Sequence, residues 1–99
     1  MRRRNGGQLR SLFSLGQVLA TPGALAALEA AGQAPQEFLD RHRVGDWGEL
    51  DPEDVKENEL ALEKGFRLFS AYTLADGSRL WIITEADRSA TTILTPMEY

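Results

Sequence analysis

The sequence contains no cysteine among its 99 residues and only one histidine, His42. Without cysteine, a disulfide framework, a thiolate metal site and a cysteine nucleophile are all excluded. A single histidine also excludes a metal site built from several imidazole groups. The absence of cysteine fits a reducing compartment, so we expect a cytoplasmic protein.

Long apolar runs and catalytic motifs are lacking as well. No run approaches the roughly 18 apolar residues of a membrane span. The basic start is followed by Asn5-Gly6-Gly7-Gln8, where a signal peptide would have its apolar region. There is no phosphate-binding glycine loop and no nucleophile elbow. We therefore expect a soluble protein without membrane contact, enzyme activity, metal or cofactor.

His42 is the one side chain that could keep an enzymatic hypothesis open. It stands in Arg41-His42-Arg43 near the end of a predicted helix, where the helix dipole favours a cation. We interpret it as a solvated histidine close to the helix cap. A small hydrolase built on carboxylates and His42 is the weakest alternative, and it requires a polar cleft around this side chain.

Length and composition predict one folded domain preceded by a short arm. The chain is 42% hydrophobic and 26% charged, which is typical of a globular protein. Residues 1–10 are polar and are predicted to form a flexible arm that carries Arg2, Arg3, Arg4 and Arg10. Residues 11–99 are predicted to form a single α+β domain.

Residues 67–95 are predicted to form a three-stranded antiparallel meander. Asp76-Gly77 suits a two-residue turn, which would place Tyr72 opposite Trp81 and Ala71 opposite Ile82. Residues on one face would then be Leu68, Tyr72, Trp81 and Ile83, and those on the other Phe69, Ala71, Leu80 and Ile82. Because both faces are apolar, each face needs a cover.

Three helices are expected to supply one of these covers. They begin at Thr21-Pro22, at Pro35 and at Asp51-Pro52; the second runs to Arg43, and the third runs to Lys64 before the stop at Gly65. Trp47 is expected to fill the junction between helices. Residues 12–19 are either a short strand or an extended covering segment. The predicted fold class is therefore α+β, with three helices and a three-stranded meander that an N-terminal strand would extend to four.

The charge distribution is more informative than any motif. Residues 46–63 contain eight acidic residues and one lysine, Lys56, which is a local net charge of −7. A solvated helix face is one explanation. The other is an acidic ridge that docks on a basic protein surface, because complementary charge accelerates association. The candidate ridge consists of Asp51, Glu53, Asp54, Glu57, Glu59 and Glu63.

Nucleic acid binding is the alternative function. Arg2, Arg3, Arg4 and Arg10 could neutralise phosphates, but four exposed charges give only weak, salt-sensitive binding. A pair of Tyr72 and Trp81 could also stack bases if its face were open, although core packing is the favoured role of such a pair. The acidic character of residues 12–99 disfavours nucleic acid as the main ligand.

Three segments resemble small uncharacterised proteins encoded on bacterial plasmids and integrative elements. They are residues 20–28 (ATPGALAAL), 45–50 (GDWGEL) and 80–92 (LWIITEADRSATT). The resemblance implies a mobile genetic element in a bacterial cytoplasm, and it brings no catalytic or binding residues. We accordingly expect a non-enzymatic accessory protein that binds another protein through the acidic ridge or a sheet face, for example an anti-defence inhibitor. A homodimer, joined through an edge strand or a sheet face, is expected over a monomer.

Overall fold

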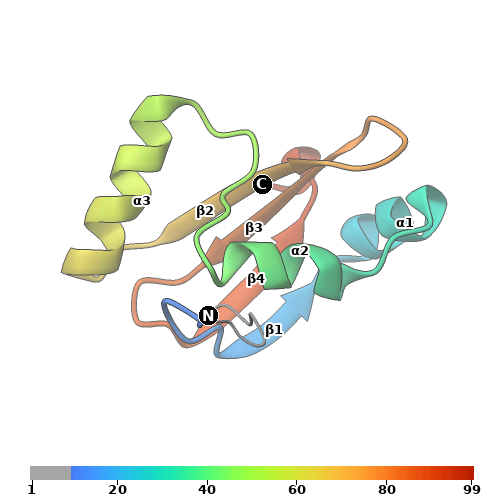
Figure 1. Cartoon of the computed structure of the whole chain (residues 1–99). Coiled ribbons are helices and arrows are strands. Elements are labelled where there is room, and N and C mark those ends of the chain that lie inside the picture. The colour runs from blue at the N-terminus through green and yellow to red at the C-terminus, as the bar shows by residue number, and fades with distance from the viewer. Residues whose placement is uncertain (1–9) are drawn as a thin grey trace.

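The computed structural model describes residues 10–99, which form an α+β fold of three helices and a four-stranded mixed sheet (Figure 1). The predicted arm lies outside the described residues apart from Arg10, which is exposed. The elements in chain order are β1 (Gln17–Ala20), α1 (Pro22–Ala31), α2 (Pro35–His42), α3 (Pro52–Lys64), β2 (Leu68–Thr73), β3 (Arg79–Thr84), β4 (Ala90–Leu94) and a 3₁₀ helix η1 (Pro96–Glu98).

The strand order in the sheet is β1-β4-β3-β2. Strands β2, β3 and β4 form the expected antiparallel meander. The N-terminal strand β1 is present, and it runs parallel to β4, so the sheet is mixed rather than wholly antiparallel. The main-chain N–H groups of Gln17 and Thr21 donate to the carbonyl oxygens of Ser89 and Ile93, which fixes β1 along the outside of β4.

The predicted register of the first hairpin is wrong by one residue. Tyr72 lies opposite Leu80, and Ala71 lies opposite Trp81. The turn has three residues rather than two: the Leu74 N–H donates to the Ser78 carbonyl, the Gly77 N–H donates to the Leu74 carbonyl, and Gly77 has φ +90°. This is a type I turn closed by a glycine bulge. Since side chains alternate along a strand, the slip of one residue exchanges the faces of β3 relative to β2.

Local signals place the helices where the sequence predicts them. The Thr21 hydroxyl accepts from the Ala24 N–H, and the Asp51 carboxylate accepts from the Asp54 N–H, so each caps its helix. Gly65, at φ +81°, ends α3 in the left-handed conformation that glycine tolerates. Helix α2 ends at His42, one residue before the predicted end.

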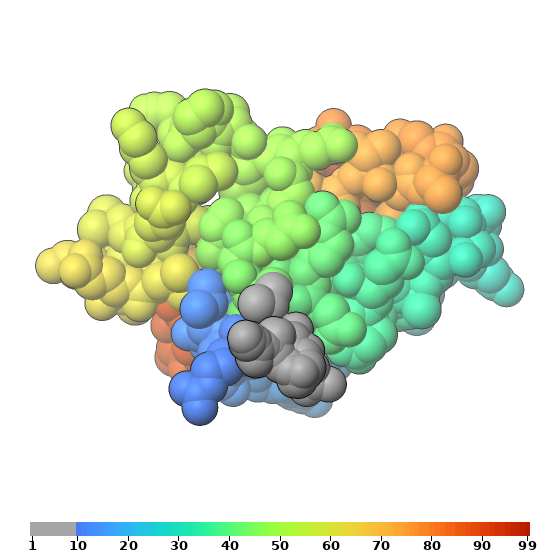
Figure 2. All heavy atoms as spheres, in the orientation of Figure 1, coloured from blue at the N-terminus to red at the C-terminus, as the bar shows by residue number. Residues whose placement is uncertain are grey.

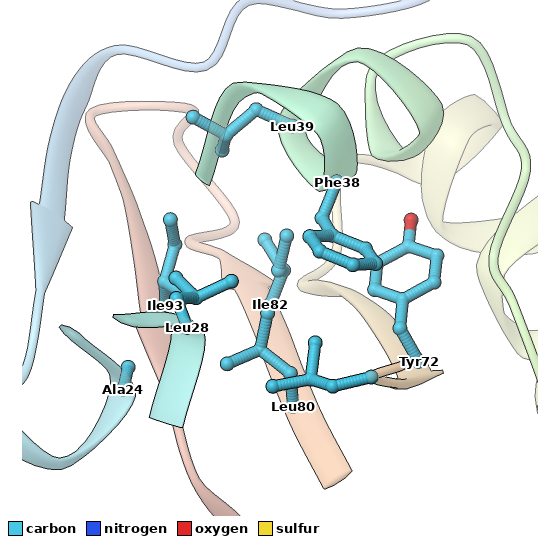
Figure 3. Close-up of a cluster of buried hydrophobic side chains, with 9 residues drawn as sticks. Ala24, Leu28, Phe38, Leu39, Tyr72, Leu80, Ile82 and Ile93 are labelled. Carbon is cyan, nitrogen blue, oxygen red and sulfur yellow. The ribbon is translucent and has the colours of Figure 1, made fainter. Parts of the chain in front are cut away.

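All three helices pack on the same face of the sheet. Helix α2 crosses its middle, with α1 and α3 towards opposite ends of the molecule (Figures 1 and 2). The main core joins side chains of α1 and α2 to every second residue of the strands, as Figure 3 shows. Its members are Ala24, Leu28, Phe38, Leu39, Tyr72, Leu74, Leu80, Ile82 and Ile93. A second cluster beneath α3 contains Trp47, Ala61 and Leu68, which confirms the structural role expected of Trp47.

The outer edge of β2 is covered. The Asn58 side chain, 3% exposed, donates from Nδ2 to the Phe69 carbonyl (2.6 Å) and accepts at Oδ1 from the Phe69 N–H (3.1 Å). Two residues further along, the Ala71 N–H donates to the Trp47 carbonyl and the Ala71 carbonyl accepts from the Glu49 N–H. Gly48 allows this approach, because a Cβ there would collide with the Ala71 carbonyl. The outward main-chain groups of Phe69 and Ala71 are thus satisfied within the chain.

Candidate functional site

The face of the sheet opposite the helices carries an aromatic surface, which we call the open face. Phe69, Trp81 and Ile83 share this face because Phe69 lies opposite Ile83, with Ala71 opposite Trp81. Leu94 joins them from β4, since it lies opposite Trp81. An antiparallel sheet with one solvated face normally carries polar residues there. The open face is therefore unusually apolar for a face that α1, α2 and α3 do not cover: Ile83 and Leu94 are each 7% exposed, and Phe69 and Trp81 are partly exposed.

The aromatic rings on the open face contact one another. The Phe69 and Trp81 ring centroids are 5.0 Å apart with an interplanar angle of 89°, and those of Trp81 and Tyr99 are 5.6 Å apart at 68°. Both are edge-to-face arrangements that aromatic pairs favour. The rings border a shallow groove of about 230 Å³, which is lined by Arg67, Leu68, Phe69, Trp81, Ile83 and Tyr99. Its volume suits one large apolar side chain better than a cofactor.

Helix η1 brings Tyr99 back over β3, and Glu98 anchors that turn. One oxygen of Glu98 accepts from the Thr21 hydroxyl (2.5 Å) and from the Thr95 N–H (2.8 Å), while the other accepts from the Gly23 N–H (3.1 Å). These bonds, the Thr21 bond first, lower the pKa of Glu98 to about 2. The carboxylate thus ties the wall of the groove to the start of α1.

Charged side chains at the rim of the open face are paired. Arg67 donates to both carboxylate oxygens of Glu85 (3.3 and 3.4 Å) and to the Tyr99 hydroxyl (3.3 Å). Arg79 lies 3.9 Å from Glu49 at the other end of β3. The rim therefore carries little net charge, and binding at the groove would depend on apolar burial and on shape.

The predicted pair of Tyr72 and Trp81 does not exist, because the hairpin register separates the two residues. Tyr72 is fully buried under α2 and donates its hydroxyl to the Asp46 carbonyl (2.7 Å). Burial raises the pKa of Tyr72 to about 12. Trp81 points to the open face instead, beside Phe69. The glycine after Asp76 is a sequence signal for this grouping, because it also fits a three-residue turn with a bulge.

The six residues of the acidic ridge are all exposed, and they lie on or next to α3. Helical geometry separates them into two rows, Glu53 with Glu57 and Glu59 with Glu63, and a row of Lys56, Leu60 and Lys64 runs between them. Asp51 is the N-cap of α3, and Asp54 lies in its first turn. Because Glu53 also lies in the first turn, three of the six have an evident helix-stabilising role, and the two rows of glutamates flank a stripe with two lysines and the 43% exposed Leu60.

Of the four arginines proposed for nucleic acid contact, only Arg10 lies within the residues that the structure describes. Arg2, Arg3 and Arg4 lie outside residues 10–99, and Arg10 is exposed at their start. Residues 10–99 contain eight of the eleven basic residues and all fifteen acidic residues, so their net charge is 8 − 15 = −7. The net charge of residues 10–99 is thus opposite in sign to the basic footprint of a nucleic acid binding domain.

His42 is buried, so the prediction of a solvated histidine is wrong. It is 0% exposed, and its ring packs edge-on against Phe13 and Trp47. Its position explains this, because His42 follows Phe38 by four residues and Leu39 by three and so shares their buried face of α2. Burial lowers the pKa of His42 to about 4, so the ring is neutral at pH 7.

A chain of buried hydrogen bonds fixes the tautomer of His42. The Thr91 hydroxyl donates to the Leu15 carbonyl (2.7 Å), so its oxygen accepts from the Thr84 hydroxyl (2.8 Å). Thr84 in turn accepts from Nε2–H of His42 (2.9 Å). Nδ1 then accepts from the Ser70 hydroxyl (2.5 Å). The three hydroxyl groups and both ring nitrogens of His42 therefore each have a hydrogen-bond partner.

The Ser70–His42 contact does not form a site that a substrate could reach. Both side chains are 0% exposed, and the network ends on a main-chain carbonyl rather than on a carboxylate. Nucleophilic catalysis needs an accessible nucleophile with an oriented base. Among residues 10–99, no three His, Asp or Glu side chains group as ligands for a metal ion. The buried network therefore specifies packing between α2, β2, β3 and β4.

Comparison with protein-family models, curated protein sequences and solved structures gives no match to this chain. The resemblance to proteins of mobile elements thus stays an expectation. Within residues 10–99, no helix has the length and apolar character that crossing a membrane would require. Among the surfaces of residues 10–99, the open face has the most distinctive chemistry.

Proposed function

We propose that this protein is a non-enzymatic interaction protein that binds another protein through the open face of its sheet. One observation carries the proposal: the helices cover a single face, while Phe69, Trp81 and Tyr99 surround a groove on the other. Aromatic side chains are enriched at the centres of protein interfaces, where they anchor partner side chains. The occupant is a partner protein that inserts one large apolar side chain between these rings.

The charge of the chain supports a protein partner over a nucleic acid. The net charge of −7 on residues 10–99 would repel a phosphate backbone. Arg67, which lines the groove, and Arg79, at the other end of β3, already face Glu85 and Glu49. Aromatic stacking of bases would have to overcome this repulsion without a free cation nearby.

The acidic ridge has a secondary role in this proposal. Its exposed carboxylates would steer a basic partner towards the molecule and raise the association rate, an effect that salt screens. Exposed charges contribute little to the final affinity. The ridge therefore sets the rate of encounter, and the groove sets the lifetime of the complex.

The setting suggested by the resemblance gives the proposal a concrete form. A mobile element benefits when its accessory protein blocks a host protein. An acidic protein with an apolar anchor site could cover a basic surface of a host protein that otherwise holds nucleic acid. Under this proposal the protein acts as an anti-defence inhibitor, and it needs no catalytic group.

Two substitutions that each introduce a carboxylate test the proposal, one beside the groove and one far from it as a control. Tyr99 is 70% exposed beside the groove, and Leu25 is 50% exposed on α1. The immobilised chain is used to capture partners from nuclease-treated bacterial extract, and the purified partner is then titrated against each variant. We expect Tyr99→Glu to weaken the affinity at least tenfold and Leu25→Glu to change it less than twofold.

Other outcomes would replace the open face with another surface. If reversal of Glu53, Asp54, Glu57 and Glu59 to lysine abolishes binding while Tyr99→Glu has no effect, the acidic ridge is the binding site. If capture disappears after nuclease treatment, the alternative of an arginine arm on nucleic acid replaces the proposal. Deletion of residues 1–10 should then abolish binding to DNA or RNA at low salt.

A further inference from the structure

The two edges of the sheet differ in a way that points to self-association. The edge at β2 is covered, since Asn58 and residues 47–49 satisfy the outward groups of Phe69 and Ala71. The edge at β1 has no such cover from residues 10–99. An uncovered edge strand presents unpaired N–H and C=O groups that can pair with another strand.

The bonds to β4 show which groups of β1 face outward. The N–H groups of Gln17 and Thr21 donate to β4, and the register places Leu19 between them as the next residue with the same orientation. In a parallel pair, residues alternate between facing the neighbour strand and facing away. The main-chain N–H and C=O groups of Val18 and Ala20 therefore point away from the sheet.

We infer that β1 pairs antiparallel with β1 of a second copy, which joins two four-stranded sheets into one of eight strands. The outward-facing residues Val18 and Ala20 have only Leu19 between them, so their main-chain groups can pair with the same groups of a second copy. If Val18 of each copy lies opposite Ala20 of the other, all four outward N–H groups meet outward C=O groups. This register puts the two copies of Leu19 face to face on the two-fold axis.

The side chains and charges around β1 favour a second copy as its occupant. Strand β1 has the sequence QVLA, without the charged or proline residues that commonly protect an edge, and Val18 and Leu19 are each 44% exposed. Helix α3, the most acidic element, packs against β2 at the opposite edge of the sheet. Pairing through β1 thus keeps the two acidic ridges as far apart as the fold allows.

The covered edge at β2 limits the assembly to two copies. If both edges were open, pairing would extend into a filament, whereas one open edge gives a closed two-fold dimer. The contact has only four residues per protomer and is smaller than the roughly 800 Å² per partner of a standard interface. The dimer should therefore be weak and should form at high protein concentration.

The lack of cysteine makes this register directly testable by single-cysteine variants. Across the proposed axis, the Leu19 Cα atoms would be about 4.5 Å apart, as in a non-hydrogen-bonded pair, which suits a disulfide. The Val18 Cα atoms would be diagonal neighbours at about 7–8 Å, too far apart for one. Val18 is equally exposed and lies next in the chain, so Val18→Cys is the matched control.

Mild oxidation of the full chain at high concentration is followed by electrophoresis without reductant. We expect Leu19→Cys to give mostly covalent dimer and Val18→Cys to give at least fivefold less. Equal yields from the two variants, or no dimer from Leu19→Cys, would overturn the inference. A sedimentation mass of one chain for the unmodified protein at high concentration would also overturn the inference.

Val18→Pro supplies an independent measurement. Because the Val18 N–H faces outward, proline there removes a dimer bond and leaves the bonds to β4 in place. We expect the sedimentation mass at high concentration to fall to that of a monomer while the circular dichroism spectrum is unchanged. A folded Val18→Pro variant that still dimerises would contradict pairing through β1. Should this variant not fold, the cysteine pair still decides.

Discussion

The burial of His42 predicts a marked loss of stability in mild acid. The folded-state pKa is about 4, and the ordinary value expected in the unfolded chain is 6.5. Between these values the unfolded chain binds a proton that the folded protein excludes, so stability is complete above pH 6.5 and falls as the pH drops towards 4. Each unit within this window costs about 1.4 kcal/mol. From pH 7 to pH 5 the free energy of unfolding should therefore fall by about 2 kcal/mol, and by about 3 kcal/mol once both states are protonated.

Because His42 is the one histidine, its titration can be observed without assignment. Proton NMR of the imidazole Cε1–H should report an apparent pKa near 4 in the folded protein. Urea denaturation at pH 7, 6 and 5 should give the predicted slope, and His42→Gln should be less stable at pH 7 but nearly independent of pH over this range. A pKa of 6 or above, or equal stability at pH 7 and pH 5, would refute the burial of this side chain.

Three further predictions concern contacts that the fold depends on. Asn58→Ala should cost about 2 kcal/mol, because two bonds to the main chain of Phe69 are lost, whereas exposed Glu59→Ala should stay within about 0.5 kcal/mol by urea denaturation; equal costs would argue against the sealed edge. Gly48→Ala should be more destabilising than Gly77→Ala, since both have positive φ but only Gly48 faces a collision, and similar melting temperatures would contradict this. The pKa of Glu98 lies near 2 against an ordinary 4.5, so its stabilising effect is complete above pH 4.5 and is lost as the pH falls towards 2; Glu98→Gln should flatten that part of the stability profile, and an unchanged profile would exclude the anchor.

Features that depend on a few neighbouring residues could be predicted from the sequence. The start of α1 at Thr21-Pro22 and that of α3 at Asp51-Pro52 follow from cap chemistry, which involves residues three positions apart. The meander and the position of the turn at Asp76-Gly77 likewise depend on residues that are close together in the chain. Strand β1 could not be decided, because its partner β4 is more than 70 residues away in the chain.

The candidate site was missed because it depends on one residue of register. Asp-Gly fits both a two-residue turn and a three-residue turn with a bulge, and the choice decides whether Trp81 and Tyr72 lie on the same face of the sheet or on opposite faces. Burial of polar side chains could have decided between them. In the observed register, Ser70, Thr84 and Thr91 share the helix face with His42, where each finds a partner. His42 follows Phe38 by four residues and Leu39 by three, and this spacing also places it on the buried face of α2.

The two proposed contacts use separate parts of the same sheet, so they can operate together. Leu19 shares the open face with Trp81, because the register passes from Leu19 to Thr92, from Thr92 to Ile83, and from Ile83 to Phe69. A dimer paired through β1 would therefore present both grooves on one continuous face, two strands away from the axis on each side. Two such sites gain avidity on a partner that is itself dimeric or repeated, provided that its spacing matches. Val18→Pro should then weaken binding to an immobilised, dense partner while leaving the affinity for a monomeric partner in solution unchanged. Equal losses in both formats would mean that the edge and the groove form one site.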